Sequence, residues 1–195
     1  MEEFTSLECL KADIFRSTGS SSRSSIIKHF FINRTVRPVI TMRMCQHYKE
    51  KKGIFAKIPF ALYRILHKVT CQLAGVDLSW KTKIGPGFCI THGWGLVISP
   101  GAVIGSNVTL FHGVTIGMKL RELSNGELEK TYPTIGDNVW IGANSVIVGE
   151  VTVGEGSVIA PLSMIIKDVE AHVTVGGNPQ KVLKKHVNQD RRILP

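Results

Sequence analysis

The stretch IGDNVWIGANSVIVGEVTVGEGSVIAPLSMIIKDVE, residues 135–170, decides the fold. Cut into sixes, every unit begins with an aliphatic residue: Ile135, Ile141, Ile147, Val153, Ile159 and Ile165. An α-helix repeats about every 3.6 residues and a flat strand about every two, so neither produces a period of six. This period predicts a short strand and a turn in each unit, with one aliphatic side chain pointing inward.

The same period runs upstream through residues 84–119. Its units also begin with aliphatic residues: Ile84, Ile90, Leu96, Ala102, Val108 and Val114. A glycine often follows the leading residue, where a tight corner needs either a positive φ or the absence of a Cβ: Gly85, Gly136, Gly142 and Gly154. One such unit cannot bury its aliphatic side chain alone, so the units must stack into a β-helix.

The chain before residue 76 has a helical period instead. Apolar residues recur at intervals of three and four, most clearly in one row: Ile54, Ile58, Leu62, Ile65, Leu66 and Val69. Gly75 is a suitable stop for this helix. The run STGSSSRSS, residues 17–25, predicts a flexible linker after a short N-terminal helix.

A polar insert, LRELSNGELEKTYPT, interrupts the sixes at residues 120–134. Inside a solenoid such an insert must leave the wall as a protruding loop. It is either a tolerated surface insertion or a lid over a binding groove. The whole chain then divides into a helical N-terminal region, a β-helix and a C-terminal tail, over residues 1–75, 76–175 and 176–195.

The net charge of +9 comes from 24 Lys and Arg against 15 Asp and Glu, and residues 1–70 hold 13 of these cations against 5 acids. No pattern of a nucleic-acid-binding module accompanies the excess. It marks a solvated basic face, or a peripheral contact with an anionic membrane surface or acidic glycan. Four cysteines without a CxxC pair, and a start without a signal-peptide pattern, favour a cytoplasmic protein, at the inner face of the membrane if the basic helices touch it.

Sixes of this kind resemble the hexapeptide repeat of left-handed β-helix acyltransferases. The resemblance implies a mainly β protein, a left-handed parallel β-helix with a small α-helical N-terminal region. It implies three sixes per coil, and therefore four coils over 84–101, 102–119, 135–152 and 153–170. It also implies a homotrimer that binds acetyl-CoA, the acetyl donor, in a groove between neighbouring β-helices, without a metal.

The stretch VDLSWKTKIGPGFCITHGWG, residues 76–95, carries the candidate chemistry. It resembles serine O-acetyltransferases, in which an Asp and a His fifteen residues later form the catalytic pair. Asp77 and His92 have that spacing, which implies that His92 is the general base and that Asp77 orients its imidazole. Acetyl transfer from a thioester to a hydroxyl needs the hydroxyl proton removed, and a neutral imidazole held by a carboxylate suits that step. His112 is a rival base, an accessory contact to acceptor or thioester, or a structural corner.

The chain departs from the serine enzymes around these residues. Thr91 stands where that family has an Asp, and Thr131 and Tyr132 stand where it has Arg-His. The missing acid and arginine would hold the ammonium and carboxylate of serine, so the sequence disfavours serine as acceptor. The pattern His92-Gly93-Trp94 resembles instead that of the colanic-acid-type exopolysaccharide acetyltransferases, with an aromatic residue two positions after the histidine. The Trp94 indole offers a flat face to a pyranose ring, or packs against a trimer neighbour.

We therefore expect acetylation of a sugar hydroxyl in exopolysaccharide, capsule or lipopolysaccharide biosynthesis, with Trp94, Thr91 and Tyr132 contacting the saccharide. Serine acetylation, acetylation of a xenobiotic and a non-catalytic scaffold stay as alternatives. A zinc hydratase on the same fold would need three converging histidines, and His92 and His112 supply only two.

Family position also assigns the acetyl-CoA groove. Ala143 and Ala160, expected one coil apart, leave backbone groups free for the pantetheine arm, and Gly117 lies beside them in VTIGM. Lys181 and Lys184 are expected at the nucleotide phosphates. A solvated C-terminal face would explain these two lysines equally well.

Overall fold

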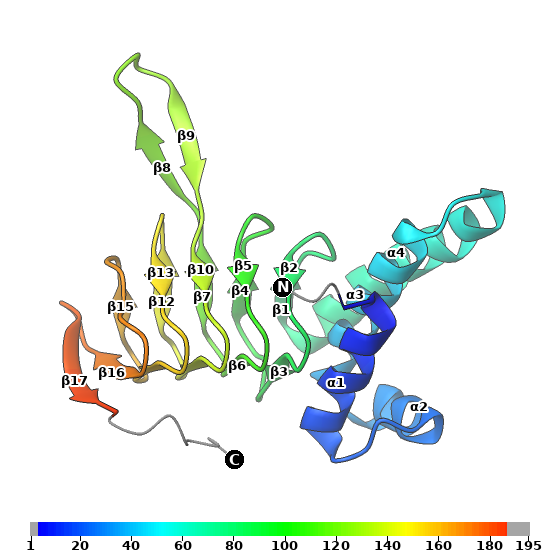
Figure 1. Cartoon of the computed structure of the whole chain (residues 1–195). Helices are drawn as coiled ribbons and strands as arrows, with labels where there is room; N and C mark the ends of the chain where they lie inside the picture. The colour runs from blue at the N-terminus through cyan, green and yellow to red at the C-terminus, as the bar shows by residue number, and fades with distance from the viewer. Residues whose placement is uncertain (1–3, 187–195) are drawn as a thin grey trace.

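A computed structural model describes residues 4–186 of the chain, so the expected C-terminal tail lies partly outside the described residues. Four helices lie at one end of a parallel β-helix, and a hairpin projects from its side (Figure 1). The fold prediction, a mainly β solenoid with a few N-terminal helices, is confirmed. Within the described residues no helix is both long and apolar enough to cross a membrane.

The helices are α1 (Ser6–Thr18), α2 (Arg23–Ile32), α3 (Val36–Glu50) and α4 (Ile54–Ala74). The linker expected over 17–25 is shorter, because α1 continues to Thr18 and Ser22 begins α2 by accepting a hydrogen bond from the Ser25 amide. Gly75, with φ +66°, is the left-handed C-cap of α4.

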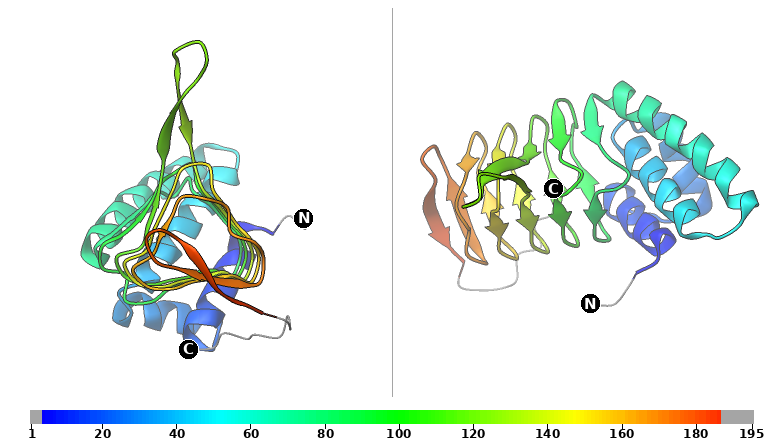
Figure 2. Two further views of the ribbon diagram at one scale, coloured as in Figure 1. Left: turned by 90° about the vertical axis from the view of Figure 1, so that its left-hand side faces the viewer. Right: turned by 90° about the horizontal axis from the view of Figure 1, so that it is seen from above.

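Three parallel sheets form the sides of a triangular prism, seen end-on in Figure 2. The first contains, in spatial order, β1 (Val76–Leu78), β4 (Leu96–Ile98), β7 (Thr115–Gly117), β12 (Val146–Val148) and β15 (Met164–Ile165). The second contains β2 (Lys83–Ile84), β5 (Val103–Ile104), β10 (Thr134–Ile135) and β13 (Thr152–Val153). The third contains β3 (Cys89–Ile90), β6 (Thr109–Leu110), β11 (Trp140–Ile141), β14 (Val158–Ile159), β16 (Val173–Gly176) and the antiparallel β17 (Lys181–Lys185).

The core is the aliphatic column predicted from the sixes, and all twelve leading residues are buried. The glycines that follow them are needed because the backbone of the next coil approaches closely, and not because they have a positive φ. A Cβ on Gly85, Gly142 or Gly154 would lie 2.4–2.7 Å from backbone atoms of the next coil. Left-handed corners fall elsewhere, on asparagines such as Asn138 and Asn144, which tolerate that conformation.

The strict frame of sixes is wrong by two residues in the first full coil. Ile90 pairs with Leu110, twenty residues later, whereas Ile98 pairs with Ile116, eighteen residues later. The corner between β3 and β4 therefore contains two more residues than the corner below it. Sequence could not show the shift, because positions two apart in a strand both point inward and both are aliphatic here. The extra residues lie in the segment 91–95, which contains His92.

The insert is a β-hairpin rather than an irregular loop. β8 (Lys119–Glu122) pairs antiparallel with β9 (Leu128–Thr131) and protrudes from the prism (Figures 1 and 2). Thr131 closes its base by donating to the Lys119 carbonyl at 3.0 Å, and Arg121 contacts both Glu129 and Glu150.

A buried ion pair docks the helices onto the first coil. Arg43 Nε donates to Asp13 at 2.8 Å, and both side chains are at most 2% exposed. Arg43 also donates to the carbonyls of Ile84 and Gly85, while Asp13 accepts from the Phe88 amide at 2.7 Å. The two charges thus stabilise one junction between α1, α3 and the β-helix.

Candidate active site

His92 lies in the enlarged corner between β3 and β4. Its φ is +66°, in the left-handed region, and Gly93 and Gly95 follow at +54° and +71°. A non-glycine residue in this region costs about 1–3 kcal/mol and persists only when its surroundings fix it. Such strain favours a functional role for the corner.

Arg34 is the residue that fixes this corner. Its guanidinium donates to the His92 carbonyl at 2.6 Å and to the Ala74 carbonyl at 2.5 Å. The Trp94 amide also donates to the His92 carbonyl, at 2.8 Å. Sequence analysis missed Arg34, because a single arginine in a turn between two helices belongs to no spacing pattern.

Trp94 is part of the same arrangement. Arg34 lies over the indole at 4.0 Å from the ring centroid, and the ring lies against Gly75, where a Cβ would come within 2.3 Å. One face of the indole is therefore occupied by a guanidinium. That face is therefore not available to stack on a pyranose ring, which is the role expected for Trp94 from the sequence.

The structure brings His92 and His112 together. Because Ile90 pairs with Leu110, His112 lies in the corner directly below, and the two ring centroids are 6.2 Å apart. The His92 side chain is exposed, whereas Nδ1 of His112 is buried and has no hydrogen-bond partner among residues 4–186. Two imidazoles on one exposed edge can accept and hold a proton next to a bound hydroxyl.

Asp77 lies near this corner but is not hydrogen-bonded to His92. It is in the middle of β1, opposite Val97, and the neighbouring Gly75 carbonyl accepts from the Gly95 amide at 2.9 Å. Within the part of the chain that the structure describes, neither the Asp77 carboxylate nor the His92 ring has a hydrogen-bond partner. The dyad implied by the resemblance therefore stays a prediction.

Small residues continue the same edge below the histidines. Ala143 follows β11 and Ala160 follows β14, so both lie where the third sheet turns into the first. They lie on neighbouring coils and one position out of register, because Ile141 pairs with Ile159 and the Ala143 carbonyl accepts from the Leu162 amide. Ala160 already uses its amide on Val175 and its carbonyl on Ser145, so its backbone groups have partners within the β-helix.

The other expected site residues are dispersed. Gly117 ends β7, where a Cβ would lie 2.9 Å from Val148 Cγ1. Lys181 and Lys184 are exposed on β17, at the far end of the prism. Thr91 adjoins His92, but Tyr132 packs on Gly101 at the edge between the first and second sheets. Within one chain Tyr132 is therefore not on the histidine edge, because the hairpin leaves the wall at a different corner.

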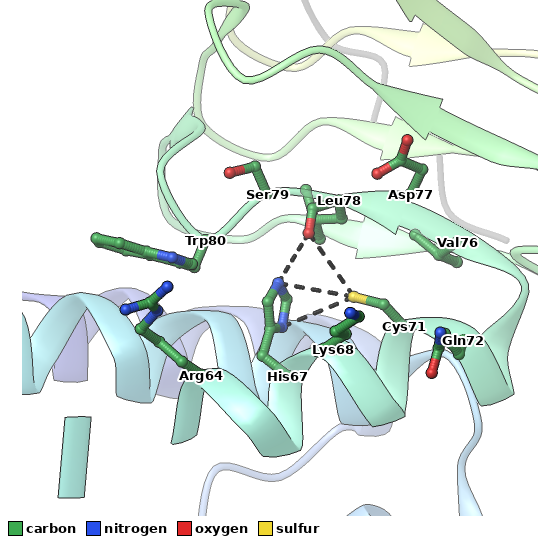
Figure 3. A pocket seen from close by; sticks show the side chains of 10 residues that line it. All are labelled: Arg64, His67, Lys68, Cys71, Gln72, Val76, Asp77, Leu78, Ser79 and Trp80. Carbon is green, nitrogen blue, oxygen red and sulfur yellow. Dashed lines mark hydrogen bonds between the residues drawn. The ribbon is translucent and has the colours of Figure 1, made fainter. Parts of the chain in front are cut away.

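A hollow of about 510 Å³ lies between α4 and β1 (Figure 3). It is lined by Arg64, His67, Lys68, Cys71, Gln72, Val76, Asp77, Leu78, Ser79 and Trp80. Burial raises the pKa of the Cys71 thiol to about 12 and lowers the pKa of His67. A thiol that stays protonated is a poor nucleophile, so Cys71 is not a candidate nucleophile.

The described residues contain no group of three His, Cys, Asp or Glu side chains that could hold a metal ion.

Comparison with known proteins bears on these features. Residues 132–167 match the family model described as bacterial transferase hexapeptide (six repeats). These residues carry the hexapeptide repeat of that family. A serine acetyltransferase of Bacillus pumilus is 38% identical over 134 residues, which cover 67% of this chain and 59% of that protein. Serine acetyltransferase 2 of Arabidopsis thaliana is 36% identical over 61% of this chain and 35% of its own length.

Solved structures agree at the level of the fold. Serine acetyltransferase of Neisseria gonorrhoeae superposes with a TM-score of 0.71 at 24% identity, covering 94% of this chain and 68% of that one. The same enzyme in complex with serine gives 0.69 at 25% identity, over 92% and 69%. The Brucella abortus enzyme in complex with coenzyme A gives 0.67 at 24%, over 93% and 67%.

These relatives correct the expected acceptor. The proteins matched in sequence and in structure are serine acetyltransferases, so the expectation of a colanic-acid-type exopolysaccharide acetyltransferase acting on a sugar is wrong. Thr91, Thr131 and Trp94 therefore do not identify a saccharide acceptor. The chain spans 35% of the length of the Arabidopsis relative and 59% of the length of the Bacillus pumilus relative.

Proposed function

We propose that this protein transfers the acetyl group of acetyl-CoA to the hydroxyl of serine. The observation that carries the proposal is the His92 corner, in a chain whose relatives are serine acetyltransferases: it is strained and exposed, and its imidazole lies edge-to-face with that of His112. One of the similar structures binds serine and another binds coenzyme A.

In the proposed reaction, neutral His92 accepts the serine hydroxyl proton as the oxygen attacks the thioester carbonyl. The C–S bond then breaks, and His92 returns the proton to the leaving thiolate. Asp77 orients the His92 ring once the acceptor is bound, and His112 contacts the thioester from the coil below. Because the thioester is already activated, no covalent enzyme intermediate is required.

We place acetyl-CoA along the histidine edge, with its pantetheine arm over Ala143 and Ala160 and its phosphates toward Lys181 and Lys184. Support comes from the shared edge, along which coils repeat about every 4.8 Å and these two small residues follow β11 and β14. A homotrimer with this edge in a groove between neighbouring prisms is part of the proposal, since His92 is exposed in a single chain.

The test follows thiol release from acetyl-CoA with serine as acceptor, for wild type, His92→Asn and His112→Asn. Asparagine is chosen because it tolerates positive φ, as at Asn138 and Asn144. We expect kcat to fall about 100- to 10,000-fold in His92→Asn at an unchanged melting temperature, and less in His112→Asn. The acceptor site lacks the family's acid and arginine, so a high KM for serine is expected.

Equal turnover of His92→Asn and wild type would remove His92 as the base. Turnover with saccharides or with other small hydroxyl compounds, but not with serine, would remove serine as the acceptor.

A further inference from the structure

The surface of α4 carries an apolar row that no described residue covers. Each of its large side chains is 43–89% exposed: Phe55, Ile58, Leu62, Ile65, Val69 and Leu73. Their spacing of three and four residues places them on one stripe. The opposite stripe packs inward through Ala56, Thr70 and Ala74. Figure 1 shows the N-terminal half of α4 projecting away from the prism.

Cations border this row and acids do not. Lys57, Arg64 and Lys68 are exposed, are spaced by seven and four residues, and therefore lie along one edge of the apolar stripe. Arg64 and Lys68 also reach the hollow shared with Trp80 (Figure 3). From residue 51 to residue 76 the chain has five Lys and Arg and neither Asp nor Glu. The nearest acids are Glu50 and Asp77, at the two ends of this segment.

We propose that α4 docks the protein onto an anionic lipid surface, with the apolar row inserted between acyl chains and the basic edge at the lipid phosphates. An apolar stripe beside a Lys/Arg edge is the pattern of helices that lie in a membrane interface. A second copy of α4 fits less well, because it would bring no acidic side chain to the three cations. This proposal is independent of the proposed function.

The experiment is co-sedimentation of the full-length protein with vesicles of phosphatidylcholine alone and of phosphatidylcholine with phosphatidylglycerol. We expect binding to the phosphatidylglycerol vesicles only, decreasing as salt is raised. Arg64→Gln and Lys68→Gln should each weaken binding about fivefold. Leu62→Glu and Ile65→Glu should each weaken it about tenfold or more. Leu120→Glu and Leu128→Glu, exposed apolar positions on the hairpin, are the matched controls and should bind as wild type does.

Absence of vesicle binding, or equal loss in the hairpin controls, would overturn the proposal. So would a lower oligomer mass of Leu62→Glu in sedimentation velocity without lipid, because a second copy would then cover the row.

Discussion

At the scale of single residues, the His92 corner depends on contacts that the sequence does not display. His92 has a conformation that favours glycine, and Arg34 holds its carbonyl while Trp94 packs on the end of α4. The corner is therefore fixed from the helical region rather than from the β-helix alone. Positioning of His92 should respond to changes in residues that never touch a substrate.

Gly75→Ala tests this dependence. Gly75 and Gly19 are both left-handed helix C-caps, but a Cβ would meet Trp94 at 2.3 Å on Gly75 and nothing within 4 Å on Gly19. Both alanines lose about 1–2 kcal/mol to the left-handed conformation, and Gly75→Ala should lose a further 1–3 kcal/mol, about the cost of overpacking. Denaturant unfolding measures both variants. Equal losses would show that Trp94 moves freely, and recovery in Gly75→Ala with Trp94→Ala would confirm the contact.

At the scale of elements, α4 is joined to α3 and β1 by a buried histidine. His67 donates from Nε2 to the Leu78 carbonyl at 2.8 Å, so Nδ1 accepts from the Thr41 hydroxyl at 2.9 Å. Burial lowers the pKa of His67 below its ordinary value of about 6.5. The neutral form of the ring is therefore favoured where these elements meet, although no sequence pattern marks His67.

This shift predicts how stability changes with pH. Below about pH 6.5 His67 binds a proton in the unfolded chain but not in the folded chain. The contribution of His67 to the stability of the fold is therefore complete above that pH and declines as the pH falls below it. His67→Gln should be less stable at pH 8 but should lose less stability between pH 7 and pH 5 than wild type. Urea unfolding over this range is the measurement. The same decline in both proteins would assign it to other groups.

At the scale of the whole molecule, the helices and the β-helix are joined by the Asp13–Arg43 pair. The two groups satisfy each other and also the backbone of the first coil. A buried ion pair of this kind adds little to the free energy of unfolding compared with well-packed apolar residues in the same place. Removing one partner, however, leaves a buried charge without its counter-charge. The junction should therefore be sensitive to loss of one partner.

Asp13→Ala should destabilise the protein by about 3–5 kcal/mol, because it leaves the buried Arg43 guanidinium without its counter-charge and the Phe88 amide without an acceptor. Chemical denaturation gives the free energy. Glu150→Ala, which removes an exposed partner of Arg121, is the control and should leave the midpoint nearly unchanged. A small loss in Asp13→Ala would show that the helices are held to the prism mainly by apolar packing.

The sequence by itself determined the solenoid, its aliphatic core and the helical N-terminal region. A six-residue repeat and a three-to-four spacing are local patterns, and each can be recognised from residues close together in the chain. It also identified His92 and His112 as candidates. Only the tertiary structure decided the two extra residues at the His92 corner, the role of Arg34, the displacement of Tyr132 to another edge and the exposure of the α4 row. These depend on contacts between residues far apart in the chain, and no local period encodes which distant side chain a corner meets.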